Sequence, residues 1–252
     1  MNGTEPTPRV KFLLNLLESE NIKYELDVFF GKDENERSRM HHINSRQNDN
    51  DDESSYENNF FNIVLRGNSN KMVIAHHDIS NPMSDNANDN SCSVINAIAL
   101  KKLRPNLNVV LTDGEELGGI GSQRLAKKIK DGDFGSIAWV LNLELTGKGG
   151  KYFFIGDYPG PLTNHIKSIF DCPIVHTPFN DSVILKKKGI DSVVINPIPP
   201  TEGNKQSQVK YGDTYLDFSV LFRCHSPEDS VDKISPSDMK EFIEEVVLKI
   251  VD

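Results

Sequence analysis

Short runs of mainly apolar residues alternate along this chain with segments whose apolar residues recur at helical spacing. Three such runs are residues 71–75, 108–111 and 136–141. They are short enough for strands, and they lack the strict alternation of a strand with one face in water. Strands buried on both faces are typical of parallel sheets covered by helices. The pattern predicts an α/β fold, a three-layer sandwich whose mixed, mostly parallel central sheet has helices on both faces.

Periodicity and capping signals locate the helices. Residues 235–238, Ser-Pro-Ser-Asp, have capping-box spacing, and apolar residues then follow on one helical face from Met239 to Ile250. By the same criteria, helices are expected over residues 7–17, 91–103, 118–130, 161–170 and 182–188.

Turn signals give two further expectations. Residues 67–70, Gly-Asn-Ser-Asn, separate the apolar runs 60–65 and 71–75, which predicts two strands joined by a tight turn. Residues 201–213 are polar and are expected to form a surface loop.

Length and composition favour a single domain over residues 1–252. With 252 residues and 37% hydrophobic content, the chain can bury one substantial core. Residues 31–59 are different, because Asn, Asp, Glu, Ser and Arg dominate there. Such a segment buries too little apolar surface to offset its ordering entropy. We expect it to be a mobile insertion within the domain.

Charge and cysteine content exclude several classes of protein. A net charge of -9 argues against nucleic acid as a partner. No apolar run approaches the roughly twenty residues that span a membrane. The N-terminus lacks the basic start and apolar stretch of a secretory signal, which indicates a cytoplasmic protein, although a secreted protein with a trimmed signal would look the same. Three cysteines without CxxC spacing suggest neither a disulfide framework nor a thiolate zinc site.

Acidic and imidazole side chains follow several of the expected strands. His76, Glu115, Glu116 and Glu144 all lie at such ends, and ligands of open α/β sheets bind beyond the carboxyl ends of the strands. Alone, each residue is more simply a solvated surface group, and Asp89 in its Asn-rich loop could cap the next helix. Together, without basic partners, they would repel one another unless cations are present. Nitrogen and oxygen ligands suit zinc or a similar divalent ion, and two ions are more plausible than one.

These residues resemble the motifs of the co-catalytic zinc aminopeptidases, the family that also contains glutamate carboxypeptidase and the animal glutaminyl cyclases. Residues 75–78, Ala-His-His-Asp, are similar to its His-x-Asp strand end, and residues 115–116 to its Glu-Glu pair. Residues 225–234, His-Ser-Pro-Glu-Asp-Ser-Val-Asp-Lys-Ile, are similar to its His-Thr-x-x-Asp-Thr-x-Asp-Lys-Ile run. The resemblance spans about residues 60–250.

The resemblance implies a site for two Zn²⁺ ions, with cobalt and manganese open as alternatives. His76 and Glu144 would bind one ion, Glu116 and His225 would bind the other, and Asp89 would bridge them. Glu144 stands where the family usually has Asp, so the geometry of this ligand is expected to differ.

The resemblance also implies an activity. Asp78 would orient His76, and Glu115 would be the general base. The expected function is that of a metal-dependent exopeptidase, specifically an aminopeptidase, in which a hydroxide bridging two zinc ions hydrolyses N-terminal residues. The expected substrate is a peptide or an amino-acid amide, and the oligomeric state stays open.

Two alternatives accompany this expectation. The glutaminyl cyclases carry out acyl transfer with one zinc ion, and some relatives are non-catalytic interaction domains. Residues 180–182, Asn-Asp-Ser, stand where the family often has Ser-Asp-His, so a His that helps line the substrate site in many members is absent.

Overall fold

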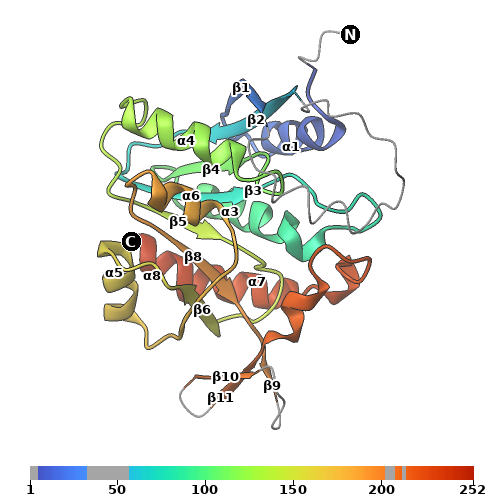
Figure 1. Cartoon of the computed structure of the whole chain (residues 1–252), viewed down its shortest axis with the longest axis vertical. Helices are drawn as coiled ribbons and strands as arrows, with labels where there is room; N and C mark the ends of the chain where they lie inside the picture. Colours follow the sequence, from blue (N-terminus) through green and yellow to red (C-terminus); the bar gives the residue numbers. More distant parts are fainter. Residues whose placement is uncertain (1–4, 33–56, 202–207, 212–213) are drawn as a thin grey trace.

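The computed structural model describes residues 5–32, 57–201, 208–211 and 214–252 (Figure 1). Within these ranges the strands form two sheets of very different size. The strands of the large sheet are β1 (Glu25–Lys32), β2 (Glu57–Leu65), β3 (Lys71–His76), β4 (Asn108–Thr112), β5 (Trp139–Leu143), β6 (Phe153–Gly156), β7 (Ile174–Val175) and β8 (Ser192–Pro197). Those of the small sheet are β9 (Pro200–Thr201), β10 (Gln208–Tyr211) and β11 (Thr214–Asp217).

The large sheet has eight strands in the order β1-β2-β4-β3-β5-β8-β6-β7. Its centre is parallel: β3 pairs in parallel with β4 and β5, and β5 with β8. Antiparallel pairs bring β1 and β2 to one side and β6 to the other. The mixed, mostly parallel sheet expected from the sequence is confirmed.

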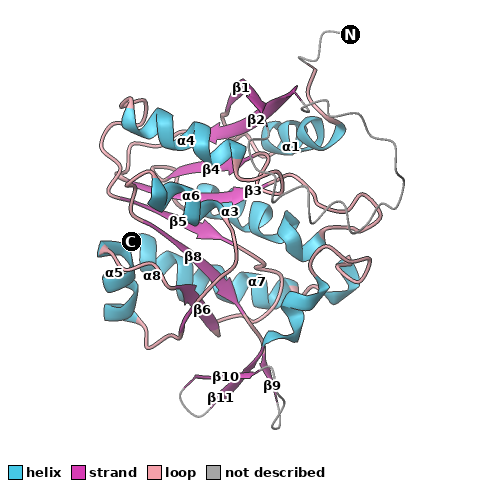
Figure 2. Ribbon diagram, in the orientation of Figure 1, coloured by secondary structure: helices cyan, strands magenta, loops and turns pink. Residues whose placement is uncertain are grey.

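Helices cover both faces of this sheet (Figure 2). The segment Ala87–Ser91, in which Asp89 and Asn90 have non-helical backbone angles, runs into α3, and a wider helical segment, Ile243–Val247, joins α7 to α8. The chain also forms short 3-10 helices at Phe218–Arg223 and Val231–Lys233. The α-helices are α1 (Pro8–Ser19), α3 (Cys92–Leu103), α4 (Ile120–Lys130), α5 (Pro161–Ile169), α6 (Asp181–Lys187), α7 (Pro236–Phe242) and α8 (Leu248–Val251).

Alternate residues of β3 enter two separate cores, which is why its sequence is apolar throughout. Val73 and Ala75 face the larger core, formed with α1, α3, α5 and the helix that runs from α7 to α8. Met72 and Ile74 face the smaller core, formed with α4 and α6. A strand with helices on both sides buries every side chain, so the continuous apolar run reflects its central position.

The last helix begins as its sequence predicts. The hydroxyl oxygen of Ser235 accepts a hydrogen bond from the backbone N–H of Asp238 at 3.3 Å, and Pro236 takes the first helical position. Phe242 then lies fully buried against the sheet.

The two strands predicted at residues 60–65 and 71–75 are present as β2 and β3, joined by residues 66–70, but they are not neighbours in the sheet. β4 lies between β2 and β3 and pairs with both. The connecting loop crosses the start of β4, where the backbone N–H groups of Asn68 and Ser69 both donate to the carbonyl of Asn106 at 2.9 Å. A Cβ atom at Gly67 would lie 2.0 Å from that carbonyl oxygen, so the close crossing requires glycine.

Residues 201–213 were expected to be a loop, but their described parts belong to the small sheet, β9 to β11. Leu216, in β11 of this sheet, packs with Phe154, Ile198 and Val220 in a third, small hydrophobic cluster.

Most of the expected insertion at residues 31–59 lies outside the described residues, although its ends are strand residues of β1 and β2. That residues 1–252 form one domain with a mobile insertion stays a prediction. In the described part of the chain, no helix is both long and apolar enough to cross a membrane.

A pair of phenylalanine substitutions tests the larger core. Phe242→Ala should lower the free energy of unfolding by about 3–5 kcal/mol, because it removes a fully buried ring. Phe12→Ala is the matched control, since that ring is 63% exposed, and should change stability by less than about 0.5 kcal/mol. Urea unfolding curves measure both values. Equal effects would show that the final helix is not docked on this sheet.

Candidate metal centre

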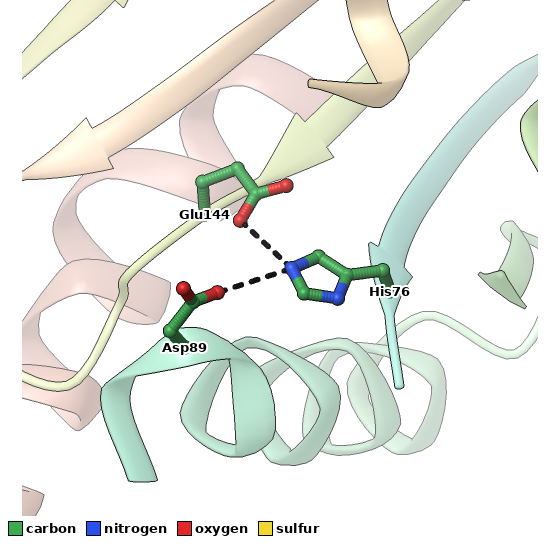
Figure 3. Close-up of side chains that lie close together, drawn as sticks. All are labelled: His76, Asp89 and Glu144. Atoms are coloured by element: carbon green, nitrogen blue, oxygen red, sulfur yellow. Dashed lines mark ion pairs between the residues drawn. The ribbon is translucent and has the colours of Figure 1, made fainter. Parts of the chain in front are cut away.

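The carboxyl ends of the central parallel strands bring His76 and Glu144 together. His76 is the last residue of β3, and Glu144 follows the last residue of β5, with which β3 is in register through Ile74 and Asn142. His76 Nε2 lies 3.5 Å from Glu144 Oε2 and 3.2 Å from Asp89 Oδ1 (Figure 3). All three side chains are buried.

Asp89 comes from the segment that leads into α3, and its backbone is fixed from outside that segment. Backbone N–H groups of Asn88 and Asp89 donate to the two carboxylate oxygens of Asp229, at 2.7 and 3.0 Å. The side chain of Asn90 donates to the carbonyl of Leu143, the last residue of β5. Asp89 is therefore held against both the end of β5 and the loop that carries Asp229.

The second oxygen of Asp89 faces a second histidine. His225 Nε2 lies 3.1 Å from Asp89 Oδ2 and 3.1 Å from Glu116 Oε2. His225 is half-exposed and has a left-handed backbone conformation, with φ of 62°. One carboxylate thus lies between two imidazoles, and each imidazole also faces a carboxylate of its own.

Asp78 fixes the turn that carries the two adjacent glutamates. Its two carboxylate oxygens accept hydrogen bonds from the backbone N–H groups of Glu115 and Glu116, at 3.1 and 3.0 Å. Its Oδ1 also lies 3.3 Å from His76 Nδ1. Gly114 has φ of 69°, a conformation that only glycine adopts without strain, and this lets the chain turn directly after β4.

Burial and mutual repulsion raise the pKa values of two glutamates in the absence of a cation. Burial raises the pKa of Glu115 well above its usual value; the His76 imidazole opposes this, and the carboxylates of Glu144 and Glu116 add to it. Burial also raises the pKa of Glu144, to about 7, against the opposing charge of His76. In both groups the charged form is disfavoured because little water reaches it.

The two histidines compensate for this negative charge. Hydrogen bonds to Asp89 and Glu116 raise the pKa of His225 to about 10. Burial alone would lower the pKa of His76, but the charge of Glu144 and contacts with Asp78 and Asp89 raise it well above 6.5. Because the folded chain holds the His225 proton more tightly than the unfolded chain does, this stabilisation is present below pH 6.5 and is lost as the pH rises through about 10.

The donor set fits divalent metal ions. Three groups have ligand atoms within 4.8 Å of one another: His76, Asp89 and Glu144; Asp89, Glu116 and His225; and His76, Glu115 and Glu116. Within the described residues, no lysine or arginine forms an ion pair with Asp89, Glu116 or Glu144. Glu116 Oε1 is buried without a hydrogen-bond partner there. Imidazole nitrogens and carboxylate oxygens without thiolates are ligands that suit zinc.

The structure brings together all five side chains that the sequence suggested as ligands, with Asp78 and Glu115 beside them. Glu144, the departure from the family pattern, has both of its oxygens engaged. Its Oε1 accepts from the side chain of Asn142 at 3.2 Å, while Oε2 faces His76. The longer side chain is therefore fixed in one orientation by its own strand.

Two buried carboxylates near the site had no role assigned from sequence. Asp229 holds the backbone of Asp89, and its place in the run that begins at His225 was the available signal. Asp181 is fully buried, accepts a hydrogen bond from the Thr112 hydroxyl at 2.6 Å and has its Oδ1 unpartnered. Burial raises the pKa of Asp181. In the sequence it stands at the Asp of the segment that corresponds to the family's Ser-Asp-His, which was the available signal.

Comparison with known proteins adds a family match. A model of peptidase family M28 matches residues 62–251. No match was found among functionally curated proteins.

Solved structures share the fold at low sequence identity. The chain is similar to a zinc aminopeptidase from Bacillus subtilis, with 18% identity over 79% of this chain and 50% of that chain, and a TM-score of 0.59. It is similar to a glutaminyl cyclase from an Acidobacteriales bacterium, with 18% identity over 96% and 82% of the two chains and a TM-score of 0.62. It is also similar to a Zn-dependent exopeptidase from Parabacteroides distasonis, with 14% identity over 98% of this chain and 91% of that chain, and a TM-score of 0.62. The chain spans about half the length of the Bacillus protein.

Zinc binding to the metal-free protein should release protons. At pH 8 the pKa of about 10 keeps His225 protonated, whereas zinc binds neutral imidazole. The zinc affinity should therefore rise between pH 7 and pH 9. His225→Ala should reduce the number of protons released by about one.

Calorimetric titration in two buffers of different ionisation heat counts these protons. His165→Ala serves as the control, because that ring contacts the carbonyl of Ile250 and is not part of the site. A binding heat that does not depend on the buffer would contradict a protonated His225.

Proposed function

This chain belongs to peptidase family M28, and we propose that it is a metal-dependent exopeptidase, specifically an aminopeptidase, that holds two zinc ions. The observation that carries the proposal is the position of Asp89. Its two oxygens face two different imidazoles, at 3.2 and 3.1 Å. A carboxylate placed in this way fits a bridge between two cations.

Each ion would have its own set of side chains. His76, Asp89 and Glu144 would hold one ion, and Asp89, Glu116 and His225 would hold the other. When bound, the ions would polarise the scissile carbonyl and lower the pKa of water. Asp78 would hold the two sets of side chains at a fixed distance from each other, because it contacts His76 and also accepts a hydrogen bond from the backbone N–H of Glu116.

Glu115 is the residue that we assign to proton transfer. It is buried, its backbone N–H is held by Asp78, and its carboxylate lies within 4.8 Å of ligand atoms of His76 and Glu116. The carboxylate would take a proton from the attacking water and return it to the nitrogen of the leaving amine, as a general acid–base does.

The charge of the site favours a substrate with a free amine over one with a free carboxylate. Two divalent ions would be balanced by the carboxylates of Asp89, Glu115, Glu116 and Glu144, and Asp78, whose pKa is lowered despite burial by its contact with His76, would make the site negative. A substrate ammonium group is attracted by such a site and a carboxylate is repelled. This supports aminopeptidase over carboxypeptidase activity.

Replacement of the proposed base tests the mechanism. Glu115→Gln should lower turnover of aminoacyl anilides by about 10²–10⁴-fold while zinc content is retained, because the amide cannot accept the proton. Glu228→Gln is the control, since that side chain is exposed on the loop after His225. Wild-type protein should not cleave the same anilides with a blocked amine. Undiminished activity in the Glu115 variant would refute its role.

Metal content tests the number of ions. Purified protein should hold about two zinc ions per chain, and Glu144→Ala should hold about one, because one ion loses a ligand. Elemental analysis after dialysis measures both. One ion in the unaltered protein would favour acyl transfer like that of the glutaminyl cyclases, and no ion would favour a non-catalytic interaction domain.

A further inference from the structure

Arg9, on α1, connects two segments of the metal centre from outside the part of the chain that matches the family. The matched region begins at residue 62, whereas Arg9 lies in the first turn of α1. Its Nε donates a hydrogen bond to the backbone carbonyl of His77. Its Nη2 donates to the hydroxyl of Ser91 at 3.0 Å. One guanidinium thus contacts both the end of β3 and the start of α3.

The first contact acts on the residue between His76 and Asp78. The backbone N–H of His77 donates to the carbonyl of Thr112 at 2.8 Å, and its Nε2 lies 2.8 Å from the carbonyl of Phe61. These two bonds fix His77 within the sheet. Its own carbonyl accepts a hydrogen bond from Arg9.

The second contact acts on the segment that carries Asp89. The Ser91 hydroxyl donates to the carbonyl of Asn86 at 2.6 Å, and the backbone N–H of Ser91 reaches the same oxygen at 3.2 Å. These bonds close the loop from residue 86 to residue 91, which contains Asp89. A group that holds Ser91 therefore holds the whole loop in place.

We propose that Arg9 is a positioning residue of the metal centre, which ties the strand end bearing His76 to the loop bearing Asp89 and so sets the separation of these two ligands. The proposal rests on the proposed function for the identity of the ligands, but the tether itself is independent of activity. Arg9 makes no contact with the proposed ligand atoms, so its effect passes through His77 and Ser91.

The Asp89 loop is held on its other side by Asp229, from the loop that carries His225. The two tethers therefore lead to different histidines. Arg9 connects Asp89 to His76, and Asp229 connects Asp89 to the His225 loop. Loss of Arg9 should weaken the ion held by His76, Asp89 and Glu144 more than the ion held by His225.

The first experiment is a zinc titration of metal-free protein against a chromogenic chelator. Arg9→Met keeps the length of the apolar stem and removes both hydrogen bonds, so one of the two ions should bind about 10–100-fold more weakly. Arg9→Lys keeps the charge, but its single ammonium group cannot reach both acceptors as a guanidinium does. Its zinc affinity should lie between those of Arg9→Met and the parent protein. Lys11→Met is the control, because Lys11 lies on the same helix and pairs with exposed Glu5.

The second experiment is hydrogen exchange of the metal-free proteins, at a temperature where thermal melting shows each variant folded. Exchange at the backbone amides of His77 and Ser91 should be faster in Arg9→Met than in the parent or in Lys11→Met. A merely structural loss would speed exchange across the core and weaken both ions equally.

Three results would overturn the proposal: unchanged zinc affinity in Arg9→Met, unchanged exchange at both amides, or faster exchange across the whole core with equal weakening of both ions. If the parent protein binds no zinc, the proposed function fails, and the exchange measurement alone then decides whether Arg9 tethers the two segments.

Discussion

Repulsion between buried carboxylates is the constraint on which the centre of this structure depends. Asp89, Glu115 and Glu144 are buried, and Glu116 has only 8% of its side chain exposed. In the metal-free chain this negative charge is balanced by the two histidine side chains, whose pKa values are raised, and by raised pKa values of Glu115 and Glu144. Divalent cations would remove the repulsion far more effectively. The fold therefore holds together a set of groups whose arrangement is explained by metal ions.

The proposed ligands are held mainly through their backbone, which allows the side chains to face one another. Asp78 binds the N–H groups of the two adjacent glutamates, and Asp229 binds that of Asp89. Both are carboxylates, so the acidic composition of the region supplies tethers as well as ligands. Arg9 adds a cationic tether from α1. Such outer groups fix the orientation of ligands before a metal binds, and they tune its affinity.

Much of the site was predictable because strand ends are visible in the sequence. Continuous apolar runs located β3, β4 and β5, and the residues after them include His76, Glu115 and Glu144. The supporting residues were harder to predict. Asp181 lies in a segment that departs from the family pattern, and Arg9 lies in the first turn of a helix with no motif around it. Their roles depend on partners 68 or more residues away in the chain.

The sequence by itself determined the fold class, the central strands and the residue types that collect at their ends, since periodicity and burial leave a local pattern. Tertiary structure alone decided the neighbours. It placed β4 between β2 and β3, which are consecutive in the sequence, and it brought His225 to the oxygen of Asp89 that does not face His76. Strand order and long-range contacts depend on how the complete sheet packs against its helices. No single segment of the sequence determines that packing energy.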